Sequence, residues 1–153
     1  MPPALICGPN EVLALVDSGS SVNAAWVSKH FPEYARFIEE TMASRRGDTA
    51  TTAGGHTLRH KGKCRISATC SGQDFSTAFR DMEVEMPILS MRKITKEYGN
   101  VTFTEDGGYI QHRGTGSVIH FHEWEGTYFM KLQVGQPEQL QLLGQPGFHR
   151  PGP

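Results

Sequence analysis

A chain of 153 residues is long enough for one domain with a substantial hydrophobic core. Its formal net charge of −1 argues against electrostatic binding of nucleic acid, which needs clustered positive charge. No apolar run approaches the roughly 20 residues of a membrane span. The N-terminus lacks the charged lead-in and long apolar segment of a signal peptide. We therefore expect a cytoplasmic (intracellular) protein that binds neither nucleic acid nor membranes.

The three cysteines Cys7, Cys64 and Cys70 cannot all pair with one another, so no closed disulfide framework is implied. Cys64 and Cys70 lie six residues apart and share one face if their segment is a strand. We interpret them as small apolar side chains in a reducing compartment.

The N-terminal third begins with a predicted β-hairpin of Ala4–Cys7 and Glu11–Val16, which ends at Asp17. Asn23–Met42 is predicted to be helical but broken, because Pro32 ends one short helix and starts another. The apolar stripe of the second helix would consist of Tyr34, Phe37, Ile38 and Met42.

A polar break at Ser44–Asp48 leads into predicted β-structure. Thr49–Ala53 and His56–His60, joined by Gly54 and Gly55, form the next hairpin. Cys64–Cys70 is a strand that turns into a second strand, Asp74–Glu85. The alternation in Asp74–Glu85 changes phase, which we explain by a bulge near Arg80 and Asp81.

Pro87–Ser90 is predicted to be a short apolar strand, followed by a helix over Met91–Tyr98 and a strand over Val101–Thr104. Further strands are expected at Tyr109–Gln111, Ser117–Trp124 and Thr127–Val134. Residues 135–153 are rich in Gly, Pro and Gln and are expected to be a disordered tail. The sum is a mostly β domain with one or two short helices.

The most informative motif is an apolar strand, Leu13–Val16, that delivers Asp17 into a Gly/Ser turn of residues 18–21. An acid followed by glycine can simply be a good turn former. Two carboxylates that share one proton, however, can act as acid and base around a water molecule. The chain has one copy of this turn, so a second acid would have to come from elsewhere.

The order of these parts resembles the retropepsin-like aspartic proteases of retroviruses and long-terminal-repeat retrotransposons. The resemblance rests on Val16–Ser21, on the hairpin at Thr52–Gly55, and on Pro87–Leu89 before a short helix. It covers residues 4–111 of a domain that we take as 1–134, with 117–134 as an extra β segment. It implies a single-lobed closed β-barrel or sandwich that acts as a homodimer and needs no cofactor.

The resemblance also implies roles for matching residues. Asp17 would be the catalytic acid, with two copies meeting across the dimer axis. The Ser18 hydroxyl would brace the paired turns, and Gly19 would let the backbone pass close to the carboxylates. The tip of a flap over the bound peptide or polyprotein would consist of Ala53, Gly54, Gly55 and His56.

Two functions stay open. The first is an aspartic endopeptidase that cleaves extended segments of a retroelement polyprotein. The second is a catalytically silent module of the same fold for dimerisation or peptide binding. Ser90, where the family usually has glycine, and the extra segment Ser117–Val134 keep the second open. The family also suggests Val101–Thr104 for intersubunit pairing.

A metal site is the third alternative. His120 and His122 would share one face of a strand, with Glu123 and His112 nearby. No third ligand is evident in the sequence, so we expect a solvent-facing strand and no bound metal.

Overall fold

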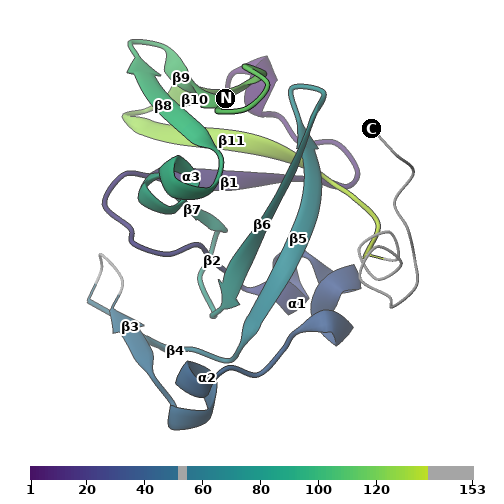
Figure 1. Ribbon diagram of the computed structural model, residues 1–153, viewed down its shortest axis with the longest axis vertical. Helices are drawn as coiled ribbons and strands as arrows, with labels where there is room; N and C mark the ends of the chain where they lie inside the picture. Colours follow the sequence, from purple (N-terminus) through teal and green to yellow (C-terminus); the bar gives the residue numbers. More distant parts are fainter. Residues whose placement is uncertain (52–54, 138–153) are drawn as a thin grey trace.

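The computed structural model describes residues 1–51 and 55–137, which form a mostly β structure (Figure 1). The main sheet has the spatial strand order β1-β7-β2-β6-β5-β11-β10-β9-β8. Because β11 pairs with both β5 and β1, six of these strands close into a barrel. The closed barrel confirms the prediction of a mostly β fold with a closed β-barrel.

The strands of the main sheet are β1 (Glu11–Asp17), β2 (Ala24–Ala25), β5 (Lys63–Cys70), β6 (Gln73–Asp81), β7 (Ile88–Ser90), β8 (Gly99–Thr104), β9 (Gly107–His112), β10 (Val118–Trp124) and β11 (Thr127–Val134). A separate two-stranded sheet consists of β3 (Thr49–Thr51) and β4 (Thr57–Arg59). The helices are α1 (Val27–His30), α2 (Met42–Arg46) and α3 (Met91–Glu97), with 3-10 turns η1 (Pro3–Leu5) and η2 (Pro32–Phe37).

Alternating side chains of β5 and β6 fill the barrel, as the sequence predicts. Every second residue of β5 from Cys64 to Cys70 is buried, and so are Phe75, Thr77 and Phe79 of β6. The two strands pair antiparallel along their whole length, from Lys63 opposite Arg80 to Cys70 opposite Gln73. Period-two burial of this kind fixes the register, because a slip of one residue would expose the apolar face.

The first predicted strand, Ala4–Cys7, is wrong. Pro3–Leu5 forms a 3-10 turn in which the Leu5 N–H donates to the Pro2 carbonyl at 3.0 Å. Proline is well suited to the first positions of such a turn, since it has no N–H to satisfy there. Leu5 is fully buried while Cys7 is exposed, so one side chain anchors the segment.

The predicted bulge within Asp74–Glu85 is also wrong, because β6 ends at Asp81. The chain then changes partners: the Asp81 carboxylate accepts from Val27 N–H, and the Met82 N–H donates to Ala25 O. Met82 and Val84 join a second apolar cluster with Ala24. The change of phase in the sequence marks the end of the strand.

The break at Pro32 is confirmed as α1 followed by η2, with Tyr34 buried and Phe37 packed on the core. The start of the predicted helical segment is wrong, because Ala24–Ala25 forms strand β2 between β7 and β6. The assignment of Met42 to the buried stripe is wrong, because Met42 is 68% exposed at the start of α2. Sequence analysis missed α2, whose N-terminus is capped reciprocally by Thr41 and Ser44.

The segment Ser117–Val134 forms the predicted hairpin, with a turn at Glu125 and Gly126 that both have positive φ. Its second strand, β11, lies between β5 and β1 and so belongs to the barrel. Beyond it, Gly135 donates to Ser67 O and accepts from the Tyr34 hydroxyl. Residues 138–153 of the predicted tail lie outside the described residues.

Candidate functional site

Asp17 is the last residue of β1, where the strand leaves the barrel. Parallel pairing with β7 places Val16 opposite Leu89 and Asp17 opposite Ser90. Val16 and Leu89 are buried, whereas Asp17 is partly exposed and Ser18 is exposed. The apolar residues of the strand therefore anchor it in the core and leave the carboxylate accessible at its end.

The turn itself curls back onto this carboxylate. The Gly19 N–H donates to Asp17 Oδ1 at 2.8 Å, and a Cβ built on Gly19 would lie 3.3 Å from the same oxygen. Such a contact is tighter than most side chains make, so a larger residue at this position would require the Asp17 carboxylate to move by a few tenths of an ångström. Ser18 has no hydrogen bond within the described residues, and its expected bond to a second copy stays a prediction.

Ser90 closes the back of the turn. Its hydroxyl donates to the Ser20 carbonyl at 2.6 Å and accepts from the Lys93 N–H at 3.1 Å, which caps α3. Ser90 is completely buried. Ser90 thus ties the Asp17 turn to the helix that follows β7.

Asn23 is a site residue that sequence analysis did not identify. Its Oδ1 accepts from the Ser90 N–H at 2.8 Å, while its Nδ2 donates to Thr77 Oγ1 and Ala78 O. The side chain is 1% exposed. One amide therefore connects the segment after the Asp17 turn to β6 and β7. No local pattern could have identified it, because its partners Thr77 and Ser90 lie 54 and 67 residues away.

The hairpin predicted as a flap consists of β3 and β4, and it stands apart from the barrel in Figure 1. Its residues Ala50 and Leu58 pack on the second apolar cluster, which includes Ala24 and against which Ile88 also packs. These two residues flank the Asp17 turn on β2 and β7, so the base of the hairpin adjoins the site.

Two residues of the expected flap tip are described. Gly55 is exposed with φ of 84°, a left-handed conformation that favours glycine, and His56 is exposed beside it. Ala53 and Gly54 lie outside the described residues.

The strand expected to pair between subunits, β8, lies at the edge of the main sheet. Within the described residues it pairs only with β9. Phe103 on this strand is 43% exposed and packs edge-on against Phe121 and Tyr128. The geometry leaves one side of the strand open for a further strand, and intersubunit pairing stays a prediction.

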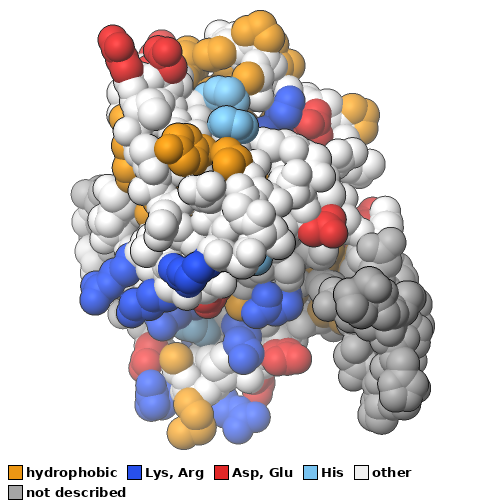
Figure 2. Space-filling model, turned by 45° about the horizontal axis from the view of Figure 1, so that its top comes forward, with side chains coloured by type: hydrophobic (Ala, Val, Ile, Leu, Met, Phe, Trp, Pro, Cys, Tyr) orange, Lys and Arg blue, Asp and Glu red, His pale blue; other side chains and the backbone are white. Residues whose placement is uncertain are grey.

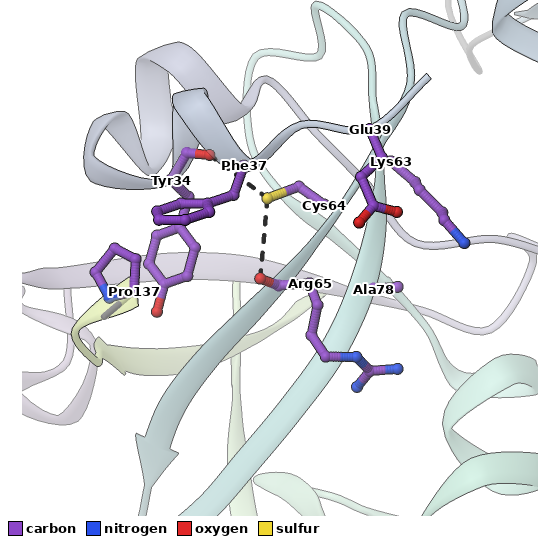
Figure 3. Close-up of a pocket in the computed structure, with 8 residues that line it drawn as sticks. All are labelled: Tyr34, Phe37, Glu39, Lys63, Cys64, Arg65, Ala78 and Pro137. Atoms are coloured by element: carbon purple, nitrogen blue, oxygen red, sulfur yellow. Dashed lines mark hydrogen bonds between the residues drawn. The ribbon is translucent and has the colours of Figure 1, made fainter. Parts of the chain in front are cut away.

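A cavity of about 440 Å³ lies elsewhere, between η2, the start of β5 and the end of the described chain (Figure 3). Aromatic and charged side chains line it together, as the close-up shows for Tyr34, Phe37, Glu39, Lys63, Cys64, Arg65, Ala78 and Pro137. None of the predicted site residues lines this cavity.

The interior cysteines have the environment expected of structural residues. Burial raises the pKa of Cys64 to about 11 and that of Cys70 to about 12. All three cysteines are free thiols. Because thiolate is the reactive form, these values keep both buried sulfurs unreactive near neutral pH.

The histidines on β10 do not converge with other ligands. His120 is exposed and lies edge-on to Tyr109, while Nδ1 of His112 on β9 accepts from the N–H groups of Gly114 and Thr115. Among residues 1–51 and 55–137, no group of three His, Cys, Asp or Glu side chains is placed to bind a metal ion.

The same residues include no helix of the length and apolarity needed to cross a membrane.

We compared the chain with protein-family models, with curated proteins and with solved structures, and found no match in any of the three.

Proposed function

We propose that the protein is an aspartic endopeptidase that forms its active site from the Asp17 carboxylates of two copies. The observation that carries the proposal is the placement of Asp17. It is an accessible carboxylate at the end of a buried strand, in a turn that Ser90 and Gly19 brace from both sides. Within the described residues, no second carboxylate is hydrogen-bonded to Asp17, so symmetry is the natural source of one.

The chemistry follows from two carboxyl groups that share one proton. The ionised group takes a proton from water, whose oxygen attacks the scissile carbonyl carbon. The protonated group donates its proton to the carbonyl oxygen, which gives a tetrahedral intermediate. Collapse of the intermediate breaks the C–N bond, and the departing nitrogen takes a proton. An extended peptide could lie between the paired turns and the β3–β4 hairpins.

The test is Asp17→Asn. Asparagine has the same shape and can still accept from the Gly19 N–H, but it cannot exchange the proton. We expect cleavage of a broad peptide library between pH 4 and 7 to fall below detection, while circular dichroism stays unchanged. Asp74→Asn, the same substitution at an exposed position on β6, is the matched control and should retain cleavage. Undiminished cleavage by Asp17→Asn would rule the proposal out.

A catalytically silent binding module is the second candidate. The accessible Asp17 turn and the edge strand β8 could also bind a peptide without cleaving it. Sedimentation at several protein concentrations separates the candidates further. Cleavage that rises with the dimer fraction supports the peptidase. Dimers that bind peptides without cleaving them support the module. A strict monomer at high concentration would contradict the peptidase, because Asp17 would then lack its partner.

A further inference from the structure

We propose that a basic pocket beside the Asp17 turn binds an acidic side chain of the peptide; this inference rests on the proposed function. The pocket has a volume of about 330 Å³ and is lined by Ser21, Arg92, Lys93 and Lys96. Ser21 ends the Asp17 turn, and the three cations come from α3. We call these four residues the basic pocket.

The cations of the basic pocket are only partly neutralised. Lys93 Nζ donates to Ala78 O at 3.1 Å and lies 3.7 Å from Glu97. Arg92 and Lys96 are exposed one helical turn apart, and no described carboxylate forms an ion pair with either. Arg113 adds a fourth cation at the end of α3, where it donates to the carbonyls of Thr95 and Lys96.

This concentration of positive charge is local, because the whole chain has a formal net charge of −1. Figure 2 shows Lys and Arg side chains gathered across the middle of one face, with few acidic side chains among them. A peptide carboxylate would complete the charge balance of the basic pocket.

Helix stability does not account for Arg92. The first turn of α3 contains Arg92 and Lys93 and no acidic residue, and positive charge there opposes the helix dipole. Lys96 lies in the last turn, where positive charge is favourable, and Lys93 contacts Ala78 O and Glu97. Arg92 is therefore the cation of the basic pocket that a structural role explains least.

The basic pocket lies within reach of a peptide bound at Asp17. Ser21 is four residues further along the chain than Asp17, and four residues span at most about 14 Å. An extended peptide advances about 3.3 Å per residue. An acidic side chain in the basic pocket would therefore lie within about four residues of the scissile bond.

The chemistry of the pocket selects a carboxylate. The guanidinium of Arg92 can donate two parallel hydrogen bonds to a carboxylate, and the Lys96 ammonium adds a second cation. Nucleic-acid phosphate shares part of this chemistry, but it would need a longer basic track than a single pocket on a chain of net charge −1.

The experiment uses fluorescein-labelled dodecapeptide libraries in which one position at a time is fixed as Glu or Gln. Binding to Asp17→Asn protein is measured by anisotropy, and cleavage by wild-type protein is measured by mass spectrometry. The test variant is R92Q/K96Q. The matched control is K63Q/R65Q, which removes the same charge from the cavity of Figure 3.

We expect Glu at one flanking position to improve binding about three- to tenfold over Gln. R92Q/K96Q should abolish this preference and K63Q/R65Q should retain it. The inference is overturned if the Glu and Gln libraries bind equally well. It is also overturned if R92Q/K96Q and K63Q/R65Q lose the preference for Glu to the same extent. Tighter binding of a single-stranded oligonucleotide than of any Glu library likewise overturns it.

The two proposals fail differently. If the wild-type protein cleaves peptides without any preference for Glu, the proposed peptidase activity is supported and the basic-pocket inference is contradicted. If the protein prefers Glu peptides in a way that depends on Arg92 and Lys96 but cleaves none of them, the inference is supported and the peptidase proposal is contradicted.

Discussion

The turn that carries Asp17 is tied to the barrel by hydrogen bonds, whereas the β3–β4 hairpin is tied to it by apolar packing at its base. Asn23 and Ser90 hold the turn through donors and acceptors of defined direction. Ala50 and Leu58 hold the hairpin through contacts that have no preferred direction. Directional hydrogen bonds therefore fix the geometry of the turn, whereas the base of the hairpin depends on apolar packing alone among these contacts.

The largest expected effect comes from removing the amide that connects the turn to two strands. Asn23→Ala should lower the free energy of unfolding by about 3 kcal/mol, because it leaves the buried Ser90 N–H without an acceptor. Urea denaturation measures the change. Asn100→Ala, at an exposed position on β8, should change stability by no more than about 0.5 kcal/mol. Equal losses in the two variants would contradict this account of the turn.

Ser90→Ala should have a smaller effect, a loss of about 1 to 2 kcal/mol in the free energy of unfolding. The substitution removes the cap of α3 and the bond to Ser20 O but leaves the backbone bond to Asn23. Ser28→Ala at an exposed position on α1 is the control. If Ser90→Ala is as stable as wild type, the hydroxyl does not brace the turn.

The smallest effect concerns the base of the hairpin and depends on pH. His60 follows β4, and its Nδ1 accepts from the Gly62 N–H at 3.2 Å. Burial, and then the charge of Arg80, lowers the pKa of His60 below 6.5, although Asp48 and Asp81 act in the opposite direction. The unfolded chain therefore binds the proton more readily, and stability declines as the pH falls below about 6.5.

His60→Gln should flatten the dependence of unfolding free energy on pH between 7 and 5 without abolishing it. Burial also lowers the pKa of His30, so part of the slope should remain. Denaturation at a series of pH values measures this, with His120→Gln at an exposed position as the control. If the unfolding free energy of His60→Gln depends on pH as steeply as that of the wild type, protonation of His60 does not destabilise the base of the β3–β4 hairpin.

Sequence predicted the features that local patterns determine. Alternation fixed the inward faces of β5 and β6, Pro32 marked the break between α1 and η2, and an apolar run located Asp17 at a strand end. These signals are local because burial imposes a period of two on a strand and proline fixes its own backbone.

The remaining features depend on contacts between distant residues. Asn23 contacts Thr77 and Ser90, which lie 54 and 67 residues away, so its role cannot be derived from its neighbours in sequence. The end of β6 is likewise set by its partners, since Asp81 and Met82 turn to bond α1 and β2. Pattern analysis instead assigned the change of phase to a bulge.

The position of β11 has a consequence for biosynthesis. The strand that carries Asp17 is synthesised well before β11, one of its two neighbours in the barrel. Pairings between segments so far apart in sequence form late and slowly. During translation the strand therefore keeps one edge unpaired until β11 has been synthesised, and the barrel closes only after residue 134.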